Sequence, residues 1–156
     1  MKGKNAFTTL GITDSEFLKS WHNAPTEVYY KAIVSPAHPN IGKPIFSATR
    51  YHYFGSEETF SVIGQYFTSE VAEIISFVIK RTLKDGTHTI GGAGSPVQGI
   101  ITMSSLVLYA KTGEITFKRD SASASISATF KFEVEHEGQT YQVSEGKLSL
   151  QATGPL

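Results

Sequence analysis

The sequence has no cysteine, no excess of charge of either sign and no long hydrophobic run. Without cysteine the chain can form no disulfide, no thiolate metal site and no cysteine nucleophile. Its 14 basic and 14 acidic side chains give a net charge of zero at pH 7, so no basic excess exists to attract nucleic acid or an anionic membrane. No apolar run approaches the ~20 residues that span a bilayer. We therefore expect neither nucleic-acid binding nor membrane insertion.

Motifs for catalysis and cofactor binding are also missing. None of the five histidines, at positions 22, 38, 52, 88 and 136, has another at the i+2 or i+4 spacing that places two metal ligands on one face. The glycine-rich segment 91–96 lacks the Gly-Lys-Ser/Thr ending of a phosphate-binding loop, and the serines of segment 121–125 lack a Gly-x-Ser-x-Gly motif. We expect no catalytic residues, no metal and no cofactor, and predict that the protein is not an enzyme.

The first ten residues do not have the pattern of a signal peptide. Lys2 and Lys4 are present, but no apolar stretch of ~7–15 residues follows them. We expect either a cytoplasmic protein or a secreted one whose leader has been removed.

A chain of 156 residues is the size of one domain with one hydrophobic core. No internal repeat of solenoid length and no composition shift typical of a linker divides it. The sequence predicts a single domain over residues 1–156.

The clearest local signal is the start of a helix near the N-terminus. Thr13 is a capping residue, and Glu16 follows three positions later, as in a capping box. A helix over about 14–23 would present Phe17, Leu18 and Trp21 as one apolar stripe, and Pro25 would prevent its continuation. We expect this helix to cross a sheet edge or to close one end of a barrel.

From about residue 28 onward the sequence changes to short β-branched and aromatic runs separated by Gly, Pro and Asp. This texture is typical of an all-β domain, an antiparallel sandwich or barrel of about 8–10 strands. The segments from which these strands are expected are Val28–Val34, Ile45–Phe54, Thr59–Phe67, Ile74–Ile79, Thr87–Ile90, Ile100–Met103, Ser105–Ala110, Glu114–Lys118, Ile126–Glu135, Gln139–Val143 and a last one with Leu148 and Leu150.

Residues 70–83 fit both a helical and a strand face. The density of β-branched residues in Ile74–Ile79 favours a strand, and Lys84-Asp85-Gly86 would turn it into a hairpin with Thr87–Ile90. The segment Ile126–Glu135 alternates apolar and polar residues with period two, which predicts a half-buried strand. Glu133, Glu135 and Glu137 on its polar face are best explained as a solvated surface, not as a metal or glycosidase site.

Aromatic residues are the candidates for binding. Tyr51 and Tyr53 lie on one side of a predicted strand with His52 on the other. If the two tyrosine rings are exposed, they could stack on a sugar or a protein partner, whereas core packing is the alternative. A cavity under the helix that carries Trp21 is the other candidate binding site.

Four segments carry a resemblance to a known group: Gly86–His88, Gly113–Phe117, Ile126–Phe132 and Tyr141–Gly146. Their order over about residues 46–150 resembles that of small uncharacterised bacterial all-β proteins, often lipoproteins. The resemblance implies a topology and no function. Ala128 stands where the group usually has glycine, His88 stands where it has tyrosine, and no anchoring cysteine is present, so membrane anchoring is not implied.

Together these observations predict a non-catalytic structural or interaction protein that binds a protein partner or self-associates through exposed β-edges. The alternative is a sandwich or barrel module that binds a glycan or a small apolar molecule.

Overall fold

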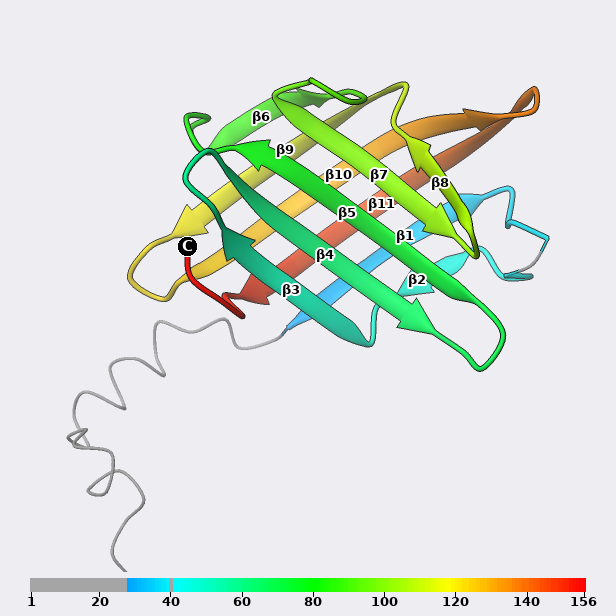
Figure 1. The fold of residues 1–156 in the computed structure, drawn as a ribbon, viewed down its shortest axis with the longest axis horizontal. Helices are drawn as coiled ribbons and strands as arrows, with labels where there is room; N and C mark the ends of the chain where they lie inside the picture. The colour runs from blue at the N-terminus through cyan, green and yellow to red at the C-terminus, as the bar shows by residue number, and fades with distance from the viewer. Residues whose placement is uncertain (1–27, 40) are drawn as a thin grey trace, which may run out of the picture.

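The computed structural model describes residues 28–39 and 41–156, and over this part the chain forms no helix and eleven β-strands, more than the about 8–10 that the sequence predicted. The strands make two antiparallel sheets that pack face to face as a sandwich (Figure 1). The strands are β1 (Tyr29–Ser35), β2 (Ile45–Ser47), β3 (Arg50–Gly55), β4 (Thr59–Phe67), β5 (Ala72–Lys80), β6 (Gly86–Ile90), β7 (Val97–Met103), β8 (Leu106–Tyr109), β9 (Thr112–Asp120), β10 (Ser125–His136) and β11 (Gln139–Gln151).

Sheet A has six strands in the order β2-β1-β11-β10-β9-β6, and sheet B has five in the order β3-β4-β5-β7-β8. In Figure 1 sheet B lies in front of sheet A, and the strands of the two sheets cross. The predicted all-β class is confirmed, and the two sheets make the fold a sandwich. The helix predicted over about 14–23, and Trp21 with it, lie outside the described residues.

The core lies between the sheets and is built by period-two alternation on the long strands. β10 shows it most clearly, because Ile126, Ala128, Phe130, Phe132 and Val134 are all buried. Aromatic rings from both sheets meet edge to face at the centre, where the Phe77 ring of β5 lies 4.8 Å from the Phe130 ring. The alternation predicted for this strand is confirmed.

Gly64 of β4 makes room for a core ring from the opposite sheet. A Cβ atom built on Gly64 would lie 2.6 Å from Cγ of Tyr30, which belongs to β1. The Tyr30 side chain is completely buried, and its hydroxyl has no hydrogen-bond partner among the described residues. The close approach of the two sheets here therefore depends on glycine.

The predicted strand Ile45–Phe54 is interrupted at Ala48 and Thr49. β2 pairs with β1 in sheet A, whereas β3 pairs with β4 in sheet B. The chain thus passes from one sheet to the other within a run whose composition reads as continuous. Residue type alone does not mark this crossing, since the residues on both sides have high β propensity.

The prediction that Lys84-Asp85-Gly86 joins two paired strands in a hairpin is wrong. β5 pairs with β4 and β7, whereas β6 crosses to sheet A and pairs with β9. The turn residues do reverse the chain, but they connect the two sheets. The later hairpin at Glu137-Gly138 is confirmed: both residues have positive φ, 50° and 78°, as a two-residue hairpin turn of type I′ requires.

The segments predicted as Gln139–Val143 and a separate last strand form one strand, β11. Its register shifts against both neighbours near Glu145, which has φ of 50°. This irregularity is a β-bulge, which breaks the alternation that a sequence pattern detects.

The free edge of β3 is covered by the end of the chain. The Thr153 N–H donates to the Tyr53 carbonyl at 2.8 Å, and the Gly55 N–H donates to the Pro155 carbonyl at 2.6 Å. A covered edge cannot pair with a strand of another molecule.

Candidate functional site

The tyrosines proposed as a stacking platform face the interior. Tyr53 is 2% exposed, and its ring lies 6.2 Å from that of Phe60 in an edge-to-face arrangement. Tyr51 is half-buried, and its hydroxyl donates to the Ala48 carbonyl at 2.7 Å. The exposure that a platform needs is therefore missing at both rings, and core packing is the arrangement found.

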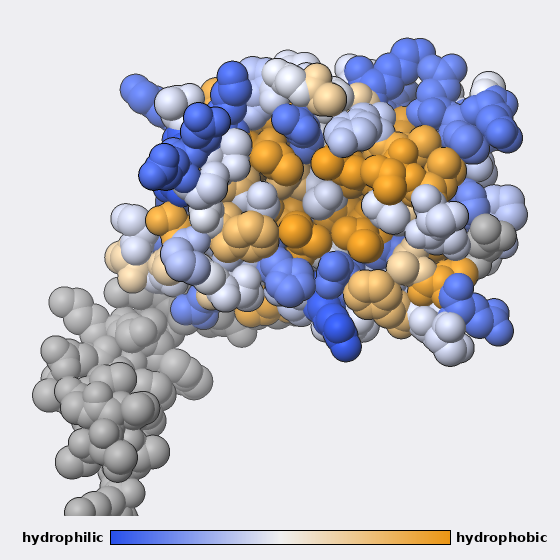
Figure 2. Space-filling view, in the orientation of Figure 1, coloured by the Kyte–Doolittle hydropathy of each residue, from blue (hydrophilic) through white to orange (hydrophobic). Residues whose placement is uncertain are grey.

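The outer face of sheet B carries apolar side chains on all five strands. Among its exposed large side chains are Phe54 of β3 at 39%, Val107 of β8 at 54% and Tyr109 of β8 at 49%. Figure 2 shows hydrophobic residues gathered over the middle of this face. Exposed apolar side chains that form one patch mark an interaction surface, whereas scattered ones do not.

The strand register places these side chains in three rows across sheet B. The first row joins β3 to β8 through His52, Ile63, Ser76, Ile100 and Tyr109. The second contains Phe54, Ser61, Val78 and Gln98, and the third contains Arg50, Gln65, Ile74, Thr102 and Val107. We call these three rows the apolar face.

Charge is confined to the margin of the apolar face. Among the outward-facing strand residues of sheet B, Arg50 and Lys80 are the charged ones, the first residue of β3 and the last of β5. Between the apolar side chains the face carries hydroxyl and amide groups, and the imidazole of His52 lies at the β3 edge with its Nε2 atom 3.2 Å from Oε1 of Gln65. Depletion of charge at the centre with aromatic side chains present is typical of protein interfaces.

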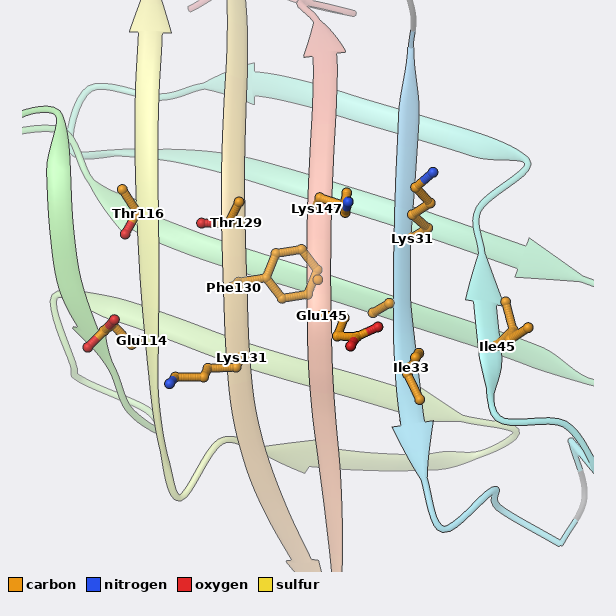
Figure 3. A pocket seen from close by; sticks show the side chains of 12 residues that line it. Lys31, Ile33, Ile45, Glu114, Thr116, Thr129, Phe130, Lys131, Glu145 and Lys147 are labelled. Carbon is orange, nitrogen blue, oxygen red and sulfur yellow. The ribbon is translucent and has the colours of Figure 1, made fainter.

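The outer face of sheet A is different in chemistry, because it carries hydroxyl and charged side chains. A hollow of about 730 Å³ lies over its middle. Figure 3 shows the lining residues that point into it from five strands. They are Lys31, Ile33, Ile45, Glu114, Thr116, Thr129, Lys131, Glu145 and Lys147, above a floor that includes Ala32, Phe130 and Gly146. We call it the sheet A hollow.

None of the charged side chains that line the sheet A hollow forms an ion pair in the part of the chain that the structure describes. An ion pair of sheet A lies outside the hollow, where Nζ of Lys111 is 2.7 Å from Oε2 of Glu135. Lys31 has its ammonium group 5.2 Å from the centre of the Tyr29 ring, a cation–π contact. The hollow therefore presents ammonium and carboxylate groups to solvent.

Glu73 of β5 is the one carboxyl among the described residues that is buried. It is 1% exposed, and its Oε1 atom has no hydrogen-bond partner in that part of the chain. Burial raises the pKa of Glu73 to about 7, against a smaller lowering by the positive charge of Lys43. Within residues 28–39 and 41–156, no group of three or more His, Asp or Glu side chains is placed to hold a metal ion.

Sequence reasoning missed the apolar face, although one signal for it existed. β5 reads Ala-Glu-Ile-Ile-Ser-Phe-Val-Ile-Lys, with apolar residues at both inward and outward positions. Near-continuous apolar runs are typical of strands covered on both faces. The sheet A hollow gave no comparable signal, because it is assembled from strands far apart in the chain.

No protein-family model matches the chain, and neither a curated protein nor a solved structure matches it. The resemblance to small bacterial all-β proteins therefore stays a prediction. No helix in the described part of the chain has the length and apolarity to cross a membrane.

Proposed function

We propose that this protein is a non-catalytic interaction protein that self-associates through the apolar face of sheet B. The observation that carries the proposal is the exposure of Phe54, Val107 and Tyr109 on a sheet face whose centre has no charge. Removing such side chains from water is favourable by about 25 cal/mol for each Å² of apolar surface.

A second copy of the chain is the partner that fits this face. Two-fold dimers need a surface that is complementary to itself, and a face whose charges, Arg50 and Lys80, lie only at its margin can meet its own copy without placing like charges together at the centre. The zero net charge of the chain also leaves little long-range repulsion between copies.

The edges of the sheets are less suited to self-association than the apolar face. The β3 edge is covered by the chain's C-terminal residues, and the other edge strands, β2, β6 and β8, have three, five and four residues. Short edge strands are a common protection against edge-to-edge pairing. We therefore propose contact between faces in place of the edge contact that the sequence led us to expect.

The size of the apolar face determines how strongly we expect two copies of the chain to associate. Five strands spaced about 4.8 Å apart make a face roughly 24 Å wide, and its rows cover roughly 20 Å along the strands. The resulting area of roughly 500 Å² is below the ~800 Å² that each partner contributes to a standard interface. We expect a dimer that dissociates on dilution.

The test is the mass in solution, measured by light scattering and sedimentation over a range of protein concentrations at low and high salt. The wild type should shift from monomer to dimer with concentration, and salt should not weaken the dimer, because no ion pair holds it. The variant Val107→Asp/Tyr109→Asp should stay monomeric, because it places charge on two exposed positions of the face.

The variant Ser127→Asp serves as the control, since Ser127 is exposed on the outer face of sheet A. It should dimerise as the wild type does. A wild type that is monomeric at every concentration, or a dimer that survives Val107→Asp/Tyr109→Asp, would refute the proposal.

A further inference from the structure

The sheet A hollow has the chemistry of a binding site that is separate from the apolar face. It lies on the opposite surface of the sandwich and crosses β9, β10, β11, β1 and β2. Its volume of about 730 Å³ lies within the range of about 300–1,000 Å³ found for ligand sites. A ligand of several sugar units or of similar size would fit.

Two lysine side chains lie on neighbouring strands of the hollow (Figure 3). Lys31 of β1 lies directly opposite Lys147 of β11 in the strand register. Cross-strand neighbours have Cβ atoms about 5 Å apart, and like charges at such positions repel. Neither lysine has an ion-pair partner in the described residues. A carboxylate or sulfate between them would remove the repulsion and form charge-assisted hydrogen bonds.

Carboxylates in the same hollow make a simple inorganic anion a poor ligand for it. Glu114 of β9 and Glu145 of β11 line it, and neither forms an ion pair within the described part of the chain. Ionised carboxylates only accept hydrogen bonds, so they would repel a sulfate ion but would bind hydroxyl groups. Thr116 and Thr129 add hydroxyls in the row that contains Lys147 (Figure 3).

The β-bulge in β11 places one of these carboxylates. Glu145 has φ of 50° and lines the hollow. A residue other than glycine in this backbone region costs on the order of 1 kcal/mol, and bulges redirect side chains beside functional sites. At the other end of the hollow, Ile33 and the 61% exposed Ile45 supply apolar surface.

We propose that the sheet A hollow binds an acidic oligosaccharide. Such a ligand carries both groups that the lining requires: an anionic substituent for Lys31 and Lys147, and many hydroxyl donors for Glu114 and Glu145. The C–H faces of its rings would pack against Ile33 and Ile45. The proposal does not depend on self-association through the apolar face.

The test is calorimetric titration of the full chain with a short oligogalacturonate, its carboxyl-reduced neutral counterpart, a chondroitin sulfate oligosaccharide and inorganic sulfate. At least one acidic oligosaccharide should bind saturably, and the neutral one and sulfate should bind at least about tenfold more weakly. Whether the uronate or the sulfated probe binds better identifies the acidic group. Amide shifts in NMR spectra should concentrate at Ala32, Thr129 and Gly146.

Two variants test the lysines and the carboxylates of the lining, and a third serves as the control. Lys31→Gln/Lys147→Gln should weaken binding of the acidic probe by about tenfold or more. Lys80→Gln/Lys84→Gln removes the same charge from exposed positions outside the hollow and should leave the affinity unchanged. Glu114→Ala should weaken binding, because it removes a hydroxyl acceptor.

Three results would overturn the proposal. The first is the absence of saturable binding by any acidic oligosaccharide, and the second is equal loss in both lysine variants, which would indicate attraction to net charge alone. The third is tighter binding by Glu114→Ala, which would show that the carboxylate only repels the ligand.

Discussion

Replacing Glu73 by glutamine should change how the stability of the protein depends on pH. Glu73 is buried at one end of β5, opposite Tyr66 of β4 and Met103 of β7. Its pKa is raised from 4.5 to about 7, first by burial, with the positive charge of Lys43 acting in the other direction. The folded protein therefore holds a proton that the unfolded chain releases at lower pH.

The sign and size of the effect follow from linkage. Between pH 4.5 and about 7 the folded state binds one proton more than the unfolded state at this site, so the free energy of unfolding falls as pH rises. The difference between pKa 4.5 and about 7 corresponds to roughly 3 kcal/mol, at about 1.4 kcal/mol for each tenfold change in the protonation equilibrium. Glutamine resembles the protonated acid and cannot ionise, so Glu73→Gln should lose this dependence.

Urea denaturation followed by circular dichroism, at fixed protein concentration from about pH 4.5 to 8.5, measures the effect. The wild type and Glu73→Gln should have similar stability at the acidic end, and the variant should be more stable by roughly 3 kcal/mol at the alkaline end. Glu70→Gln, at an exposed loop position, should follow the wild type. Parallel curves for the wild type and Glu73→Gln would refute the reasoning, because they would show that Glu73 titrates alike in the folded and unfolded states.

Three other substitutions or truncations test the packing and the covered edge. Tyr30→Phe removes a buried hydroxyl without a partner and should raise the free energy of unfolding by about 1 kcal/mol in urea denaturation; a loss of stability would mean that the hydroxyl is satisfied. Gly64→Ala would place a methyl group 2.6 Å from the Tyr30 ring and should lower stability by about 1–3 kcal/mol, whereas unchanged stability would show that the sheets can separate there. Removal of residues 153–156 should leave the fold intact but uncover the β3 edge, so light scattering should detect aggregation that the full chain does not show.

The sequence predicted individual strands better than their partners. Alternation identified β10, and the paired positive-φ positions explain why Glu137-Gly138 marked a true hairpin. Lys84-Asp85-Gly86 has similar turn chemistry but connects different sheets. Turn residues specify that the chain reverses, whereas the sheet that receives the next strand depends on long-range packing.

The candidate sites were harder to predict for the same reason. Tyr51 and Tyr53 were correctly placed on one side of their strand, but alternation does not say which side is inward. The exposed side of sheet B became visible only once its five strands were assembled in order. The sheet A hollow joins Lys31 to Lys147 and Glu114, which no local pattern could bring together.

The strand order also has a consequence for the synthesis of the protein. Every strand of sheet B has left the ribosome once Tyr109 has emerged, whereas sheet A needs β11, which pairs with β1 and ends at Gln151. Sheet B is apolar on its inner face, which sheet A later covers, and on its outer face. A nascent chain that ends between these points would expose both faces of sheet B together, and such surfaces are prone to aggregation and are bound by chaperones. The same side chains that we propose for recognition in the finished protein thus form a hazard while it is being made.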